Sequence, residues 1–355
     1  MTKIRFSSII AILTLSVFFT SCDDTININA DYSVTPVIFG ILDHGDSIHY
    51  IKITKTFLGD GDNNEFAKIP DSSYFRQVDA KIIELKDEVE TGRQWILKDS
   101  TVLTKEDGVF YNPSQKVFVF YEKELKEDHQ YKLEAILNEG EYTVDATTSL
   151  IDGFKYDNFF LSTESLTFAA SNGNNLSFPI RYKEGRNATS YQTKIVINYS
   201  ETYINNTTEI KSIVWSAAAN NGFGDGEINP DNPTNRSITF RGQDFYNFVS
   251  AQLNVDENVT NRKLIDVDII TEIGHEDLMK YIEVSQPSSG LAQTTPLFTN
   301  VNGGLGLFSS RHIASRLGMG LTSGSIEVLC TREPTNIYKF CSTLPVHSSK
   351  FFYCN

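Results

Sequence analysis

The stretch at residues 36–57 reads PVIFGILDHGDSIHYIKITKTF, and its pattern decides the fold. An apolar run leads into the turn sequence DHGD at 43–46, and a second run follows in which Ile51 and Ile53 alternate with lysine and threonine. A period of two is typical of a strand with one buried face, because successive side chains of a strand point to opposite sides. The stretch therefore predicts a β-hairpin with one face in a core.

The same alternation recurs along the rest of the chain. It predicts strands at residues 78–82, 131–137, 142–146, 176–182, 193–199 and 264–273, with a shorter one at 305–309. The run KVFVFY at 116–121 predicts a strand buried on both faces. Pro179 has no backbone N–H to donate, so its strand is expected at a sheet edge. The aromatic content of 12%, with 24 Phe and 16 Tyr, suits such strands.

Two short segments have helical spacing instead. Apolar residues repeat at the helical period in 245–252 and again in 278–282, where Glu276 and Asp277 fall in the first turn. Both apolar faces are interpreted as packing faces. They are the two helices expected in a chain that otherwise consists of strands.

The length of 355 residues is enough for two domains. Many short strands separated by turn signals predict an all-β fold of two immunoglobulin-like β-sandwich domains, at 34–150 and 151–355, with both helices in the second. Polar loops are expected at 59–73 and 217–236. We predict that these two loops are contact surfaces, because rigid sandwiches carry function on their loops.

The N-terminal segment has the features of a signal peptide. Lys3 and Arg5 precede an apolar run at residues 9–19. A transmembrane helix needs about 20 apolar residues, so this run is too short to span a bilayer and fits a signal peptide over residues 1–21.

The signal peptide ends in Thr20-Ser21-Cys22, which resembles a bacterial lipobox, with Phe19 where leucine is usual. The resemblance implies that Cys22 is the lipid attachment site and that residues 22–33 are a tether. The alternative is an ordinary signal peptide with an incidental cysteine. Asp23 and Asp24 resemble a surface-export signal of Bacteroidota lipoproteins, although in enteric bacteria aspartate there resembles an inner-membrane retention signal.

The other cysteines, Cys330, Cys341 and Cys354, lie close to the C-terminus. An exported protein can form disulfides, so a Cys341–Cys354 bridge is one reading and a Cys330–Cys341 bridge is its rival. A zinc site is disfavoured because His347 is the one histidine near them. Three free thiols remain a further alternative.

No catalytic constellation, metal site or cofactor motif is predicted. The six histidines form no metalloprotease pattern, and the nucleophile elbow G-x-S-x-G does not occur. Acidic residues at 60–64 are interpreted as a solvated loop, because Glu65 stands where a helix-loop-helix calcium motif needs glycine. The net charge of −14 argues against nucleic acid as a partner and against a basic membrane-binding patch.

Three stretches together resemble a known family. They are residues 35–57, residues 131–148 and, most specifically, PLFTNVNGGLGLFSSR at 296–311. They resemble Bacteroidota outer-membrane lipoproteins that form a domain family of unknown function, often encoded beside TonB-dependent transporters. The resemblance covers about residues 22–341 and implies a transporter as partner. It implies no catalytic residues, because the family has none established.

We therefore expect a non-enzymatic lipoprotein, held in the outer membrane by its lipid and exposed at the cell surface. The resemblance implies an accessory or binding role beside a TonB-dependent transporter. The alternatives are a surface hydrolase of glycans or peptides and a structural envelope protein. Acidic residues that converge in one deep cleft would favour the hydrolase.

Overall fold

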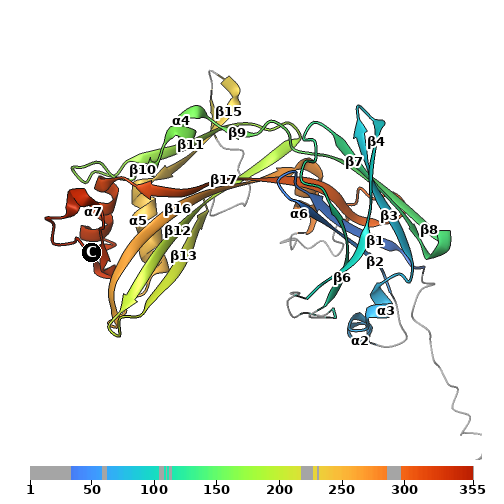
Figure 1. Ribbon diagram of the computed structural model, residues 1–355, viewed down its shortest axis with the longest axis horizontal. Helices are drawn as coiled ribbons and strands as arrows, with labels where there is room; N and C mark the ends of the chain where they lie inside the picture. Colours follow the sequence, from blue (N-terminus) through green and yellow to red (C-terminus); the bar gives the residue numbers. More distant parts are fainter. Residues whose placement is uncertain are drawn as a thin grey trace, which may run out of the picture. The chain divides into compact units, whose positions relative to one another are not determined.

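The structure is a computed structural model that describes residues 33–57, 62–103, 108, 110–111, 114–216, 227–229, 232–285 and 297–354. The predicted signal peptide, Cys22, nearly all of the tether and much of the loop at 217–236 lie outside these residues. The described part is mostly β and forms three sheets, which confirms the predicted all-β fold class (Figure 1). No helix among the described residues is long and apolar enough to cross a membrane.

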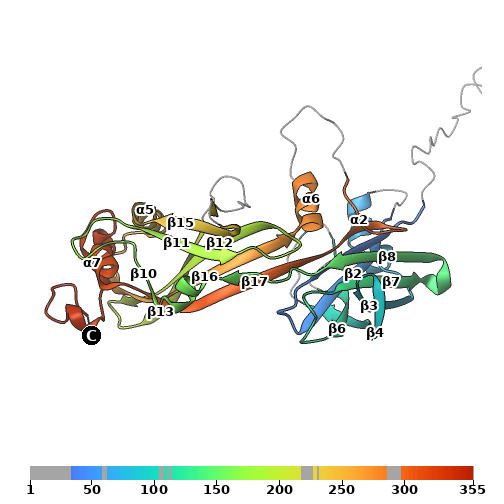
Figure 2. The same cartoon turned by 90° about the horizontal axis from the view of Figure 1, so that it is seen from above.

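The N-terminal strands form two facing sheets (Figure 2). In one sheet the order is β1-β2-β6-β5, with bounds Pro36–Leu42, Ile48–Lys55, Gln115–Tyr121 and Lys98–Val102. In the other the order is β4-β3-β7-β8, with bounds Val89–Ile96, Val78–Lys86, Gln130–Leu137 and Tyr142–Ser149. The sheets meet through aromatic rings, since the ring centroid of Trp95 in β4 lies 5.7 Å from that of Phe120 in β6.

Burial along these strands follows the sequence pattern. Ile51 and Ile53 of β2 are buried, whereas Lys52 between them and Thr54 after them are on the other face. All four residues from Val117 to Phe120 are buried, as the run without a polar side predicts. Both observations confirm the sequence-based assignment of this hairpin and of β6.

The C-terminal strands also form two layers. The long strands β13, β12 and β16 (Thr208–Ser216, Ala188–Tyr203 and Val259–His275) lie side by side, and β18 (Phe340–Cys341) pairs with β16. The second sheet has the order β14-β15-β11-β9, with bounds Glu227–Asn229, Asn232–Arg241, Ser177–Lys183 and Lys155–Tyr156. The layers are joined by the Tyr182 and Tyr191 rings at 5.0 Å and by a 2.9 Å hydrogen bond from Tyr156 to Thr271.

Pro179 occupies a local edge of its sheet. It pairs with Thr239 of β15 on one side, and on the other side β9 pairs only with Tyr182 and Lys183. In the described part of the chain, the missing N–H of Pro179 therefore interrupts no strand pairing on that side. The predicted edge strand is not confirmed, because β11 lies between β15 and β9; the described residues show only that β9 does not reach as far as Pro179.

The strand β17 (Leu305–Leu321) joins strands from both halves of the sequence into one sheet, of order β13-β12-β16-β17-β1-β2-β6-β5 (Figure 1). Its first residues pair in parallel with β1, from Val37 opposite Leu305 to Leu42 opposite Ser310. From Arg311 onward it pairs in antiparallel fashion with β16. The short strand β10 (Ser165–Leu166) also pairs with β17, near its end. The division into two domains at residue 150 stays a prediction. Strand pairing connects the two predicted domains, because β17 pairs with β1 of the first and with β16 of the second.

The predicted helices are α5 (Gly242–Gln252) and α6 (Glu276–Ser285), and the prediction of both is confirmed. The expectation of only two helices in the second half is wrong. In that half the structure adds α4 (Asn158–Ser162) and α7 (Ser323–Thr331), with short 3₁₀ turns at Asn336–Tyr338 and Pro345–His347; a further 3₁₀ turn lies at Asn138–Gly140 in the first half. Most of α7 is buried, so it lacks the polar face that reveals a helix in sequence.

The prediction of two irregular loops is also partly wrong. The loop at 59–73 contains two short helices, α2 (Asn63–Ala67) and α3 (Pro70–Ser73). Asp62 caps α2 by accepting a 2.8 Å hydrogen bond from the N–H of Asn64, and Pro70 starts α3 where its missing N–H costs nothing. Inside the predicted loop at 217–236, Glu227–Asn229 form β14 and the residues from Asn232 onward belong to β15.

Candidate functional site

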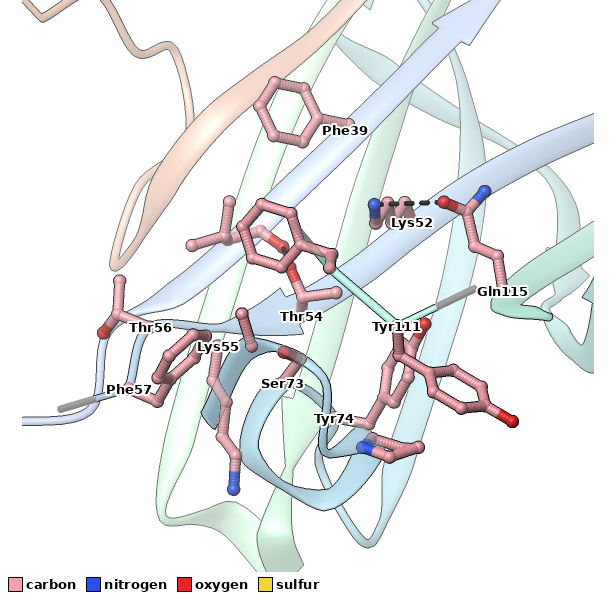
Figure 3. A pocket seen from close by; sticks show the side chains of 14 residues that line it. Phe39, Lys52, Thr54, Lys55, Thr56, Phe57, Ser73, Tyr74, Tyr111 and Gln115 are labelled. Carbon is pink, nitrogen blue, oxygen red and sulfur yellow. Dashed lines mark hydrogen bonds between the residues drawn. The ribbon is translucent and has the colours of Figure 1, made fainter. Parts of the chain in front are cut away.

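A cavity of about 420 Å³ lies on the face of β1 and β2 opposite the core (Figure 3). Its lining is rich in aromatic rings and contains few charged groups. The lining residues are Val37, Phe39, Lys52, Thr54, Lys55, Thr56, Phe57, Ala67, Pro70, Ser73, Tyr74, Phe110, Tyr111 and Gln115. In this described lining there is no carboxylate.

The floor of the cavity follows from strand register. Phe39 lies opposite Lys52, and Val37 lies opposite Thr54, in the antiparallel pair of β1 and β2. The residues between them on each strand, Ile38 and Ile53, are buried in the core, so the pleat turns these four side chains to the cavity. Lys52 Nζ donates a 3.1 Å hydrogen bond to Oε1 of Gln115, as Figure 3 shows.

The wall comes from α2, α3, Phe110 and Tyr111. The backbone N–H of Tyr111 donates to the carbonyl of Ala67 at 3.1 Å, which holds Tyr111 against the end of α2. The Tyr74 hydroxyl accepts a 3.2 Å hydrogen bond from the N–H of Lys116 at the start of β6. These bonds connect the wall to the sheet, so the cavity is formed by secondary structure on both sides.

A second, more polar cavity of about 640 Å³ adjoins the first, and the two share Lys55, Pro70, Tyr74 and Tyr111. It is also lined by Asp71, Arg76, Asp99 and Lys116. Lys116 Nζ forms a 2.7 Å ion pair with Asp99. The combined site therefore has an apolar, ring-lined part next to a part with charges of both signs.

Such a lining suits binding of a small organic molecule. Ligand pockets are concave and mostly apolar, with a few polar groups that fix orientation. The rings of Phe39, Phe57 and Tyr74 offer flat apolar contact, and Lys52 and Gln115 offer hydrogen bonds. We call the two cavities together the β1–β2 pocket.

The structure describes some of the site residues predicted from the sequence and not others. Cys22 lies outside the described residues. Cys341 and Cys354 are joined by a disulfide, which is the first of the pairings considered from the sequence. Cys330 is a free thiol in α7, and burial raises its pKa to about 12, so it stays protonated at neutral pH.

A contact surface was predicted at 59–73, and α2 and α3 of that segment line the β1–β2 pocket. The pocket itself was not predicted from the sequence. The available signal was the polar side of the first hairpin, where Lys52 and Thr54 alternate with the buried isoleucines. Sequence spacing could not show that Tyr74 and Tyr111 would meet this face.

We expect removal of the Cys341–Cys354 disulfide to destabilise the C-terminal tail. The bond closes a segment with a sequence separation of 13, and loop-closure entropy gives a loss of about 3 kcal/mol. Cys341→Ser and Cys354→Ser should each lower the denaturation midpoint by the same amount, and the double variant should lower it no further. A double variant that loses clearly more than either single variant would contradict this prediction.

Comparison with known proteins identifies no family. No protein-family model matches the chain, and no curated protein matches it.

Proposed function

We propose that the protein is a non-enzymatic, lipid-anchored binding protein of the outer membrane, exposed at the cell surface. It holds a small organic ligand in the β1–β2 pocket and acts beside a TonB-dependent transporter. The observation that carries the binding role is the pocket, with its aromatic lining and its adjoining charged part. The anchor and the transporter rest on the N-terminal sequence and on the family resemblance.

The ligand class follows from the lining. Rings on the floor and wall favour a ligand with a flat or apolar face. The cationic groups of Lys52 and Lys55 at this face favour a ligand that also carries hydroxyl, carbonyl or anionic groups. An aromatic sulfonate such as anilinonaphthalene sulfonate combines these features and serves as a probe.

Blocking the pocket is the most direct test of binding. In Thr54→Trp, an indole replaces a small side chain on the pocket floor, and we expect it to abolish most of the fluorescence gain of the sulfonate probe. The matched control is Thr147→Trp, because Thr147 is an exposed strand threonine on β8 that does not line the pocket. Equal probe binding by both variants would show that the probe binds elsewhere and would contradict the proposal.

The transporter role has a separate test. The tagged full-length protein is purified from mildly solubilised outer membranes, and co-purifying proteins are identified by mass spectrometry. We expect a TonB-dependent transporter in stoichiometric amount, and its loss when residues 217–236 are deleted. Recovery of the lipoprotein alone would exclude a stable complex while leaving the pocket test intact.

A further inference from the structure

A second group of side chains meets outside the β1–β2 pocket. Asp43 and His44 lie in the turn that links β1 to β2, and His312 lies in the middle of β17. Parallel pairing of β1 with β17 places Leu42 opposite Ser310, so the turn after β1 comes up against His312. Strand topology thus unites two residues from the start of the chain with one from near its end.

The three side chains are close enough to share one ion. Each offers one ligand atom, and these atoms lie within 4.8 Å of one another. Asp43 Oδ1 lies 3.2 Å from His312 Nδ1. Two ligands of a tetrahedral zinc ion with bonds near 2.0 Å are separated by roughly 3.3 Å, so this spacing suits a shared metal.

The carboxylate of Asp43 is held in place by the backbone. Its side chain is almost fully buried, Oδ1 accepts a 2.9 Å hydrogen bond from the N–H of Gly45, and Oδ2 accepts a 3.1 Å bond from the N–H of Ile313. Hydrogen bonds to a ligating carboxylate orient it and are part of most metal sites. Asp43 therefore has the supporting contacts of a positioned ligand.

One ring nitrogen of His44 contacts a carboxylate, and the other has no hydrogen-bond partner among the described residues. Its Nε2 lies 3.4 Å from Oε1 of Glu127, whose other oxygen accepts a 3.1 Å hydrogen bond from the N–H of Gly153. Its Nδ1 is buried and has no hydrogen-bond partner in the described part of the chain. A histidine that gives one nitrogen to a carboxylate and keeps the other for an ion is the common arrangement at metal sites.

We propose that Asp43, His44 and His312 bind a divalent transition-metal ion of the zinc class, with Glu127 as the carboxylate partner of His44. Two imidazoles and one carboxylate form a ligand set that zinc accepts, leaving a fourth position for water or another ligand. Hard ions such as calcium prefer six or more oxygen ligands and do not fit this set. This inference does not depend on the proposed ligand pocket.

Metal binding requires a small side-chain movement. The rings of His44 and His312 are stacked with centroids 4.1 Å apart and planes 20° apart. Nitrogen lone pairs lie in the ring plane, so at least one ring turns about its Cβ–Cγ bond to aim at a shared ion. The two side chains are 17% and 16% exposed, so neither ring is fully enclosed by the protein.

The test is zinc binding by the full-length protein in mild detergent after removal of metals with a chelator. We expect equilibrium dialysis to give one zinc ion per chain, and calcium to give none. In His44→Asn and in His312→Asn, zinc affinity should fall at least about 10-fold, the lower end of losses seen for disturbed metal sites. The matched control is His129→Asn, which removes a histidine paired with Asp128 at 2.8 Å and should leave the affinity unchanged.

A readout on the unaltered protein avoids dependence on the folding of variants. Cobalt added to the metal-free protein should give the visible absorption of a four-coordinate site, and one equivalent of zinc should displace it. Failure of the unaltered protein to bind zinc would overturn the proposal, and so would equal affinity in all three histidine variants.

Discussion

Gly306→Ala should lower the free energy of unfolding by about 4 kcal/mol or more, because the substitution combines backbone strain with a steric clash. Gly306 has φ of +111°, a backbone conformation that other residues rarely adopt. A Cβ atom at this position would lie 1.9 Å from the carbonyl oxygen of Ile38. Since Ile38 is the β1 residue opposite Gly306, relief of the clash must push β1 and β17 apart.

The measurement is urea denaturation of purified protein, followed by circular dichroism. Gly318→Ala is the matched control, because Gly318 lies on the same strand with φ of +71° and no atom lies within 4 Å of its added Cβ. We expect the control to lose only about 1 kcal/mol, the lower end of the cost of strain alone. Equal losses in the two variants would show that the contact between the strands is not tight.

Arg262→Met should lower the free energy of unfolding by about 3 kcal/mol, because it removes one of the two cationic partners of a buried carboxylate. Arg262 of β16 is 3% exposed, and its Nε donates a 2.7 Å hydrogen bond to Glu201 of β12. A second nitrogen of the guanidinium donates to the carbonyl of Tyr338 at 2.7 Å. The residue thus joins two strands to the segment that precedes β18.

The cost should arise from Glu201 rather than from lost packing. Burial alone would raise the pKa of Glu201, but hydrogen bonds from Lys211 and Arg262 outweigh it and lower the pKa, so the group is charged at neutral pH. The double variant Arg262→Met/Glu201→Gln removes that charge and should recover a measurable part of the loss. Lys68→Met breaks an ion pair with side chains 57% and 69% exposed, and this control should change stability by less than about 1 kcal/mol.

Strands with clear alternation of apolar and polar residues were predictable, because the pattern that reveals them lies within a few consecutive residues. Ile51 and Ile53 of β2, and the unbroken run of β6, point to buried faces whatever they pack against. β17 shows where this reasoning ends. Only its first residues were predicted, because Arg311, His312 and Arg316 interrupt the apolar pattern where the strand continues along β16.

The candidate sites were less predictable than the strands. The β1–β2 pocket needs residues of the first hairpin together with Tyr74 and Tyr111, which reach it by tertiary packing. The proposed metal ligands Asp43 and His312 are 269 positions apart, and no spacing motif connects them. The predicted lipid on Cys22 depends on a local motif instead, which is why it could be proposed from sequence alone.

The parallel pairing of β1 with β17 also sets the order in which the molecule can be completed. Chains are synthesised from the N-terminus, and β1 emerges long before residues 305–310. Until then one side of β1 is an open hydrogen-bonding edge, of the kind that invites mispairing with other chains. The free edge of β1 therefore stays unpaired until nearly the whole polypeptide has been synthesised. We expect nascent chains that end before β17 to be the most prone to aggregation and the most dependent on a chaperone.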